Sequence, residues 1–410
     1  MIRFLFACIL FSLSTVPIPA QNNYTSLHFL DLEENRFHNI NRAENADGLL
    51  RKLALVCKGE TQPISVLHIG DSHLQAGFYS NEIRQNLQNY FSSGTTGSFG
   101  ILFPFQVAKT NNPGNYAIQS TGEWESCKAV DQKPTCRIGL TGITVMTKDS
   151  TASLSLQMKK YFPVTNYSFD KVRIFYEDPD SAYQLQIRPK GKIQKDSAGI
   201  IVSLEHKTDS FQLKMIKKSQ HADSSHFYFY GFNVQNKRSL FTYHSVGVNG
   251  AKAKSYLRCQ HLPQQLEALQ PDWVIISLGT NEAYNKNYDQ EEFRRHLSAL
   301  IDRIREHAEN TFILLNTPGD GLIKGKSKNL NNLKARDDII ALARKKKCAW
   351  WDFYNIMGGE GSIDAWFQHE LTARDRLHLN KKGYRLKGNL FFDAFEEIFN
   401  PYLNKTLKDN

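Results

Sequence analysis

The serine at position 72 lies in a setting that can make a hydroxyl reactive. A run of strand-forming residues, 64–69, ends in a Gly-Asp-Ser-His turn, and a helical pattern follows from Phe78. The strand carries the hydroxyl to the edge of a sheet, the glycine permits a sharp turn, and the following helix offers free backbone N–H groups to a developing oxyanion. Ser72 is therefore a candidate nucleophile.

His378 is the candidate base for this serine. A serine hydroxyl is nearly inert at its own pKa and must lose its proton to a neighbouring base as it attacks. Asp375 precedes His378 by three residues, a spacing at which a carboxylate can accept the imidazole N–H and fix its tautomer. Without Ser72, the same Asp-x-x-His spacing would more often describe a helix-capping aspartate and a surface histidine.

Two further residues could bind the oxyanion that forms during attack on an ester. Gly247, in Ser-Val-Gly-Val-Asn-Gly, and Asn281, in Leu-Gly-Thr-Asn-Glu, each follow a predicted strand. The backbone N–H groups of Ser72 and Gly247, with the side-chain amide of Asn281, would then face the charged oxygen. Taken separately, Gly247 could be only a turn and Asn281 only a helix N-cap.

These four blocks, in this order, resemble the SGNH (GDSL-type) hydrolase family. The resemblance implies that Ser72 is the nucleophile, His378 the base and Asp375 its orienting partner, with Ser72, Gly247 and Asn281 as oxyanion donors. It also implies a flavodoxin-like, three-layer α/β fold and a carboxylic ester hydrolase that needs no metal and no cofactor. His73 replaces the leucine of the commonest family motif, and we expect it to support the site rather than act as the base.

Strand-length apolar runs alternate with helical patterns on both sides of a central segment. The pattern predicts strands at residues 64–69, 241–246, 273–278, 312–316 and 349–353, and helices at 43–57, 78–90, 257–269, 291–307, 333–347 and 382–399. Such alternation implies a parallel sheet that is covered by helices on both faces.

The central segment has a different pattern, with short alternating runs separated by turn-forming residues. It predicts an all-β insertion of jelly-roll type at residues 106–238, between two parts of a hydrolase domain at 21–105 and 239–410. This order of blocks is similar to that of periplasmic peptidoglycan O-acetylesterases, whose insertion resembles a carbohydrate-binding module. Whether the insertion binds sugar or only shapes the cleft stays open at this point.

Residues 1–20 read as a cleavable signal peptide, with a basic start, a short apolar stretch and a small residue at Ala20. This predicts a periplasmic or secreted protein with no membrane span after cleavage. Five cysteines then remain, and Cys127 and Cys136 suit either a hairpin disulfide or simple burial.

The chain has 410 residues and a net charge of +10. A basic exported protein can gather near anionic surfaces, although an ordinary solvated surface would have the same composition. Nothing in the sequence resembles a nucleic-acid-binding motif, so no nucleic-acid partner is expected.

From the residues and the resemblance together, we expect a serine esterase that removes O-acetyl groups from a cell-wall glycan, most plausibly peptidoglycan. Three alternatives stay open. The first is an O-acetyltransferase, or a deacetylase of another exported polysaccharide. The second is a lipase or thioesterase with the same catalytic residues. The third is a binding module in which the insertion does the work and the α/β part is only a scaffold.

Overall fold

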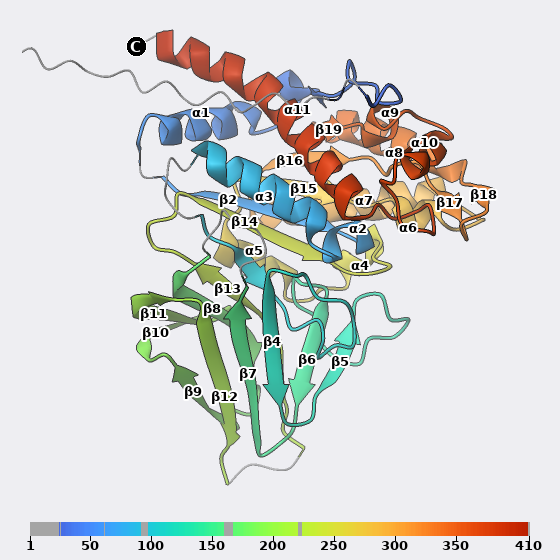
Figure 1. The fold of residues 1–410 in the computed structure, drawn as a ribbon. Helices are drawn as coiled ribbons and strands as arrows, with labels where there is room; N and C mark the ends of the chain where they lie inside the picture. The colour runs from blue at the N-terminus through green and yellow to red at the C-terminus, as the bar shows by residue number, and fades with distance from the viewer. Residues whose placement is uncertain are drawn as a thin grey trace, which may run out of the picture.

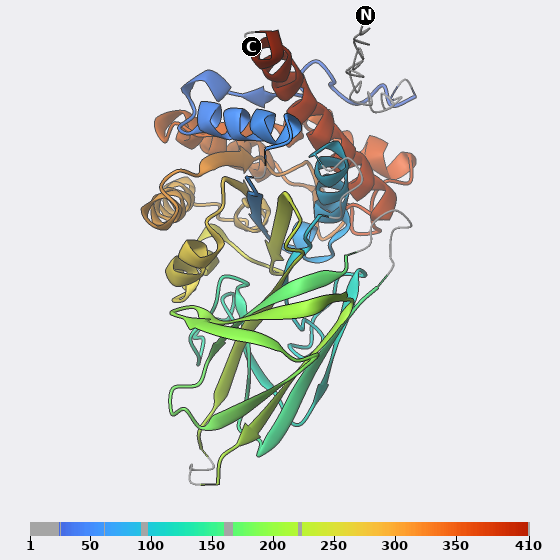
Figure 2. The same cartoon turned by 90° about the vertical axis from the view of Figure 1, so that its left-hand side faces the viewer.

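The computed structural model describes residues 24, 26–60, 62–91, 97–159, 167–219 and 224–408. The predicted signal peptide lies outside these described residues. In the described part, an α/β domain lies above an elongated β domain, which the chain enters after α3 and leaves before β14 (Figures 1 and 2).

The α/β domain is built on a sheet whose central strands are all parallel. Its order is β1-β19-β16-β15-β2-β14, and only β1 runs antiparallel to its neighbour. The strands are β1 (Phe37–His38), β2 (Ile64–Gly70), β14 (Phe241–Gly247), β15 (Trp273–Ser277), β16 (Phe312–Asn316) and β19 (Ala349–Trp351). Numbered along the chain, the parallel strands have the spatial order 2-1-3-4-5, which is the flavodoxin-like arrangement. The predicted α/β fold is confirmed.

Helices cover both faces of this sheet (Figure 1). The layer on one face consists of α1 (Ala46–Cys57), α3 (Phe78–Phe91) and α11 (Lys381–Lys408), and that on the other of α5 (Leu262–Leu269), α7 (Gln290–His307) and α8 (Asn331–Lys345). Along β2, Val66 packs toward the first layer and Leu67 toward the second, because successive side chains of a strand point to opposite faces. A strand buried on both faces reads as a continuous apolar run.

Two helix predictions were wrong in their limits. The expected helix at 257–269 is divided into α4 (Ala253–Leu257) and α5. Pro263 lies in the first turn of α5, where its missing N–H leaves no hydrogen bond unmade, and this favours the start of a new helix. Helix α11 continues to Lys408 through Pro401, well past residue 399. Its last turns are held by the buried Leu403 and by Tyr402, whose hydroxyl donates to Asp47.

The inserted all-β domain is confirmed as two antiparallel sheets. One has the order β10-β11-β8-β13-β6-β5, with β3 added beside β13, and the other has the order β4-β7-β12-β9. The strands are β3 (Gly100–Leu102), β4 (Tyr116–Thr121), β5 (Glu125–Lys128), β6 (Ile143–Thr147), β7 (Thr151–Met158), β8 (Phe169–Glu177), β9 (Tyr183–Arg188), β10 (Gly191–Asp196), β11 (Gly199–Thr208), β12 (Ser210–Lys217) and β13 (Phe227–Gln235). Phe211 and Phe232 meet between the sheets with ring centroids 5.7 Å apart.

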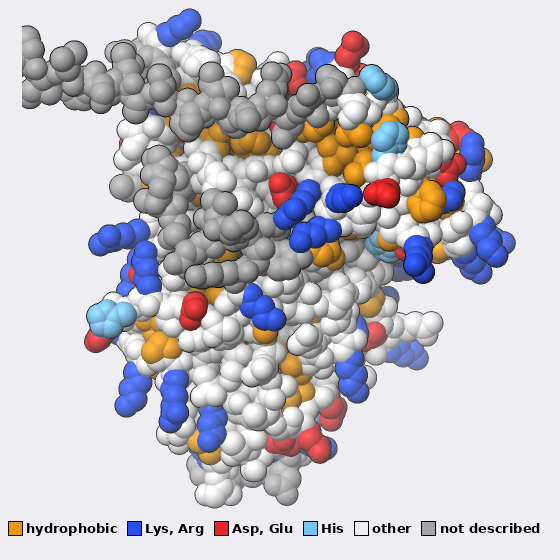
Figure 3. Space-filling model, in the orientation of Figure 1, with side chains coloured by type: hydrophobic (Ala, Val, Ile, Leu, Met, Phe, Trp, Pro, Cys, Tyr) orange, Lys and Arg blue, Asp and Glu red, His pale blue; other side chains and the backbone are white. Residues whose placement is uncertain are grey.

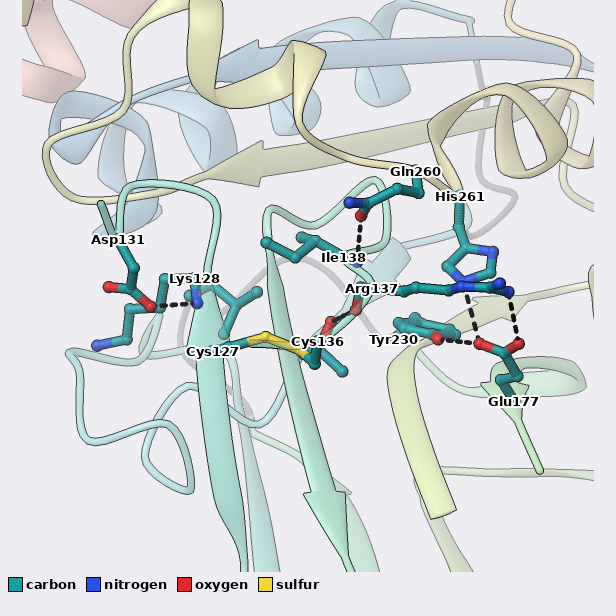
Figure 4. The surroundings of a disulfide bond; sticks show 12 residues. Cys127, Lys128, Asp131, Cys136, Arg137, Ile138, Glu177, Tyr230, Gln260 and His261 are labelled. Atoms are coloured by element: carbon teal, nitrogen blue, oxygen red, sulfur yellow. Dashed lines mark hydrogen bonds and ion pairs between the residues drawn. A yellow bond between two sulfur atoms is a disulfide. The ribbon is translucent and has the colours of Figure 1, made fainter. Parts of the chain in front are cut away.

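A disulfide joins Cys127 to Cys136, so one of the two possibilities left open by the sequence is realised (Figure 4). Of the remaining described cysteines, Cys57 is exposed, and Cys259 and Cys348 are buried. The chain just after Cys136 contacts the α/β domain, since the Gln260 side chain accepts a hydrogen bond from the backbone N–H of Ile138 at 2.8 Å (Figure 4).

On the face shown in Figure 3, Lys and Arg side chains are spread over both parts of the molecule rather than gathered in one cluster. Within the described ranges, no helix combines the length and the apolar character that a membrane span requires.

The short elements at one edge of the parallel sheet complete the fold. They are α2 (Ser72–Gln75), α6 (Thr280–Ala283), α9 (Phe353–Ile356), α10 (Ser362–Gln368) and the hairpin of β17 (Leu322–Ile323) and β18 (Ser327–Lys328). Helix α10 follows α9 after a short connection, and its Trp366 is fully buried. These elements surround the residues that were expected to do chemistry.

Candidate active site

Three neighbouring strands end level with one another. Gly247 of β14 and Ser277 of β15 both pair in register with Gly70 of β2. The segments that follow these strands therefore leave the sheet at the same edge, and they carry Ser72, the loop after Gly247, and Asn281. This edge is where flavodoxin-like sheets bind their ligands, at the point where the strand order reverses.

Ser72 begins α2 directly after the turn that ends β2. Asp71 caps the helix, and its Oδ1 accepts a hydrogen bond from the backbone N–H of His73 at 3.0 Å. The Ser72 Oγ lies 2.8 Å from Nε2 of His378, although 306 positions separate the two residues along the chain. The structure thus brings the expected nucleophile and the expected base into hydrogen-bond contact.

His378 and Asp375 belong to one tight turn. The Asp375 Oδ2 lies 2.7 Å from Nδ1 of His378, while its Oδ1 accepts from the backbone N–H groups of Leu377 and His378, each at 3.0 Å. Arg376 sits in the left-handed region, with φ of 47°, which lets the chain reverse within these four residues. Asp375 therefore caps a turn and orients the imidazole at the same time.

The charge on Asp375 favours one tautomer of His378. Partial burial alone raises the pKa of this carboxyl, but the hydrogen bonds from His378 and from the turn's backbone N–H groups outweigh it and hold the pKa below its ordinary value. An ionised Asp375 accepts the proton of Nδ1–H and leaves Nε2 free to accept the proton of the Ser72 hydroxyl.

Asn281 lies on α6, just beyond the end of β15. Its Nδ2 donates to the backbone carbonyl of Ala251 at 3.0 Å and to Oδ2 of Asp71 at 3.2 Å. Asp71 is 1% exposed, and burial raises its pKa to about 6, against the opposing hydrogen bond from His73 N–H. Asp71 therefore does more than hold its own turn, because it also orients the amide of Asn281. The sequence did not reveal this second contact.

Gly247 lies flat against α2, with no room for a side chain. A Cβ atom at this position would be 2.6 Å from the backbone nitrogen of Gln75 and 2.8 Å from the carbonyl oxygen of Asp71. The loop after Gly247 also contacts the strand ends, since Val248 N–H donates to the carbonyl of Gly70 at 3.4 Å. All five expected site residues, Ser72, Gly247, Asn281, Asp375 and His378, thus gather at one edge of the sheet.

His73 packs behind the expected base. Its ring lies 4.9 Å from that of His378 in a stacked arrangement, and its Nδ1 is 2.9 Å from the hydroxyl of Tyr384. Burial and the neighbouring His378 lower its pKa well below the ordinary range, so His73 is neutral. Its place fits a supporting residue. His68, in contrast, lies inside β2, where Tyr243 and Ser277 hydrogen-bond its two ring nitrogens.

A buried lysine lies on the same side of the site. Lys387 of α11 is 6% exposed, and its Nζ lies 4.0 Å from the ring centroid of Phe353 and 4.7 Å from that of Tyr79. Burial lowers the pKa of Lys387 to about 7, with Asp71 acting in the opposite direction. Lys387, Asp71 and His73 line a cavity of about 30 Å³, which is large enough for a water molecule.

The parallel sheet and the Ser–His–Asp contacts define a serine-hydrolase-like α/β protein. Residues 222–386 match the profile of the GDSL-like Lipase/Acylhydrolase family. Over this part of its sequence the chain is similar to the GDSL/SGNH hydrolases, a family of ester hydrolases.

Solved structures resemble the chain to different extents. A peptidoglycan O-acetylesterase is similar with a TM-score of 0.71 at 22% identity, over 86% of this chain and 96% of that one. A lipase/acylhydrolase from Enterococcus faecalis has a TM-score of 0.30 at 18% identity, over 39% and 77% of the two chains. A catalytic mutant of an acetylxylan esterase from Geobacillus stearothermophilus has a TM-score of 0.31 at 16% identity, over 39% and 73%. The comparison with curated proteins found no match.

Proposed function

We propose that this chain is an exported serine esterase that removes O-acetyl groups from peptidoglycan. The observation that carries the proposal is the hydrogen-bonded series from Ser72 through His378 to Asp375, with contacts of 2.8 and 2.7 Å. In a family of ester hydrolases, this arrangement supports attack of a serine on an acyl carbon.

In the first half of the reaction, Ser72 Oγ attacks the acetyl carbonyl carbon, and its proton passes to Nε2 of His378. The Asp375 carboxylate stabilises the imidazolium. When the tetrahedral adduct collapses, the bond between the acetyl carbon and the sugar oxygen breaks, and that oxygen takes the proton from His378. In the second half, a water molecule loses a proton to His378 and attacks the acyl-serine carbon. When this second tetrahedral adduct collapses, the bond between the acetyl carbon and Ser72 Oγ breaks, Oγ takes the proton from His378, and acetate leaves.

The proposed oxyanion donors are the backbone N–H groups of Ser72 and Gly247 and the amide of Asn281. In the structure, the Asn281 amide is already held by two acceptors, of which Asp71 Oδ2, at 3.2 Å, is the more distant. We assign this longer bond as the one exchanged for the substrate oxyanion, while the bond to Ala251 keeps the amide in place.

The choice of peptidoglycan rests on overall architecture. The similarity to a peptidoglycan O-acetylesterase extends over 86% of this chain, a share too large for the α/β domain alone, so it includes the inserted β domain. The signal-like residues 1–20 agree with a substrate in the periplasm or outside the cell.

The test is acetate release from O-acetylated peptidoglycan by the protein without residues 1–20, beside its Ser72→Ala variant and a small aryl acetate as a second substrate. Release that disappears in Ser72→Ala supports the proposal. Ser72-dependent cleavage of the aryl acetate with no release from peptidoglycan would contradict this choice of substrate. Transfer of acetyl to a sugar hydroxyl in place of free acetate would make the protein an O-acetyltransferase.

A further inference from the structure

One short segment of the inserted β domain forms hydrogen bonds at the edge of the active site. Thr110 and Asn111, in the connection between β3 and β4, hydrogen-bond to Gln75 at the end of α2, the helix that starts with Ser72. Pro113 packs against the next turn, since a Cβ on Gly77 would lie 3.0 Å from its side chain. The segment is therefore fastened beside the proposed nucleophile.

Gln75 is the centre of this joint. It is 2% exposed, and every polar atom of its side chain is used. Its Nε2 lies 2.9 Å from Thr110 Oγ1, from the backbone carbonyl of Asn111 and from Asn111 Oδ1. Its Oε1 accepts a hydrogen bond from the backbone N–H of Asn249 at 2.7 Å. One buried amide thus links α2, the inserted domain and the loop that follows β14.

That loop, residues 247–251, is the oxyanion loop, because it begins with the proposed donor Gly247. It is held at its far end by Asn281, which donates to the carbonyl of Ala251. Near its middle, besides the bond to Gln75, the Asn249 side chain donates to Asn111 Oδ1 at 2.7 Å. Asn111 Oδ1 therefore accepts from both Gln75 and Asn249, and ties the oxyanion loop to the inserted domain.

We propose that Gln75 is a positioning residue through which the Thr110–Asn111 segment of the inserted β domain holds the oxyanion loop in its working position. An oxyanion donor acts only within about 2.7–3.1 Å of the charged oxygen, so a small displacement of the Gly247 N–H weakens transition-state binding more than substrate binding. The inserted domain then serves the chemical step whether or not it binds sugar. This inference rests on the proposed function, in which Ser72 is acylated and Gly247 is a donor.

The chain offers a matched control at another contact between the two domains. Gln265 of α5 is also 2% exposed, and its Oε1 accepts from the backbone N–H of Leu140 in the inserted domain at 2.6 Å. It is a buried interdomain glutamine like Gln75, but it lies outside the set of residues around Ser72. A general weakening of the domain contact would affect both glutamines alike.

The experiment measures kcat and KM for a small aryl acetate, which does not need the glycan, in Gln75→Leu, Asn111→Ala, Asn111→Asp, Gln265→Leu and Ser72→Ala. We expect Gln75→Leu and Asn111→Ala to lower kcat roughly tenfold or more with little change in KM. Asn111→Asp keeps the shared acceptor oxygen and should restore most of kcat. Gln265→Leu should lower the Tm but leave kcat unchanged.

The outcomes distinguish a failure of the proposed function from a failure of the positioning role. If Ser72→Ala keeps its activity, the proposed serine chemistry fails, and the positioning role fails with it. If Ser72→Ala is inactive but Asn111→Ala has the kcat of the unmodified protein, the proposed function stands and the positioning role is wrong. The exposed Asn111 can be changed without burying a new group, so this arm remains decisive even if Gln75→Leu does not fold. Equal loss of kcat in Asn111→Ala and Asn111→Asp would also overturn it.

Discussion

The carboxyl edge of the parallel sheet and the interior of the inserted β domain bury different kinds of side chain. At the sheet edge, Asp71 and Lys387 are 1% and 6% exposed, and they line the same cavity as His73, whose ring stacks on His378. Between the two β sheets of the inserted domain, the buried side chains include aromatic ones such as Phe211 and Phe232. Burying polar and charged groups is costly unless they are well paired. The buried polar and charged groups at the sheet edge therefore lower the free energy of unfolding, whereas the apolar interior of the inserted domain raises it.

The difference between the sheet edge and the inserted domain predicts how substitutions in each region act. Substitutions at the sheet edge should change kcat more than the free energy of unfolding, and substitutions inside the inserted domain should do the reverse. The Thr110–Asn111 segment is the expected exception, because it belongs to the inserted domain and contacts the edge.

The largest effect is expected at Ser72. Ser72→Ala removes the proposed nucleophile and should lower kcat by about 10⁴-fold or more, since loss of one member of a catalytic triad can cost nearly as much as loss of all three. A serine-directed organophosphonate should label only Ser72, and His378→Ala should prevent labelling. Ser203→Ala, on β11 of the inserted domain, is the matched control. Labelling at another serine would refute the assignment.

The next effect concerns Asn281. Asn281→Ala removes a proposed oxyanion donor and should lower kcat by about 10²–10³-fold with little change in KM. Asn281→Asp has nearly the same size but cannot donate from this position, so it should be impaired as well. Steady-state kinetics with an aryl acetate measure both variants. An effect confined to KM would indicate substrate binding instead.

The third effect concerns the buried charge of Lys387 and its cost to the free energy of unfolding. Because burial lowers its pKa from 10.5 to about 7, the unfolded chain binds the proton more tightly than the folded protein between these values, and stability rises with pH there. Lys387→Met should be more stable than the unmodified protein at pH 6, by about 2–5 kcal/mol, and the difference should shrink as pH rises and vanish only above pH 10.5. Chemical denaturation at pH 6 and pH 9.5 measures it. A difference independent of pH would contradict the buried-charge explanation.

The smallest effect is expected in the inserted domain. Replacing both Cys127 and Cys136 with serine opens a loop of nine positions and should lower the free energy of unfolding by about 2–3 kcal/mol. The kcat of the folded protein should not change. Cys57→Ser, at an exposed free thiol, is the control for the loss of a sulfur atom. A loss of kcat without a loss of stability would break the comparison between the two regions.

Much of the site could be predicted because its signals are local. Ser72, Gly247 and Asn281 each follow a strand that the apolar pattern identifies, and parallel strands place their carboxyl ends at one edge of a sheet. The turn that joins Asp375 to His378 lies within four residues. Such patterns report interactions that are close along the chain, and the sequence carries them directly.

Other features depend on contacts between distant parts of the chain, and only the tertiary structure decided them. Nothing near Asp71 in the sequence points to Asn281, 210 positions away, and nothing near Gln75 points to Asn249, 174 positions away. The disulfide between Cys127 and Cys136, one of two possibilities that the sequence left open, was also decided by the tertiary structure. By itself, the sequence determined the α/β class, the all-β insertion and the residues able to do chemistry. The hydrogen bonds that aim those residues, including the joint at Gln75, depend on how the two domains pack, and local patterns do not encode that packing.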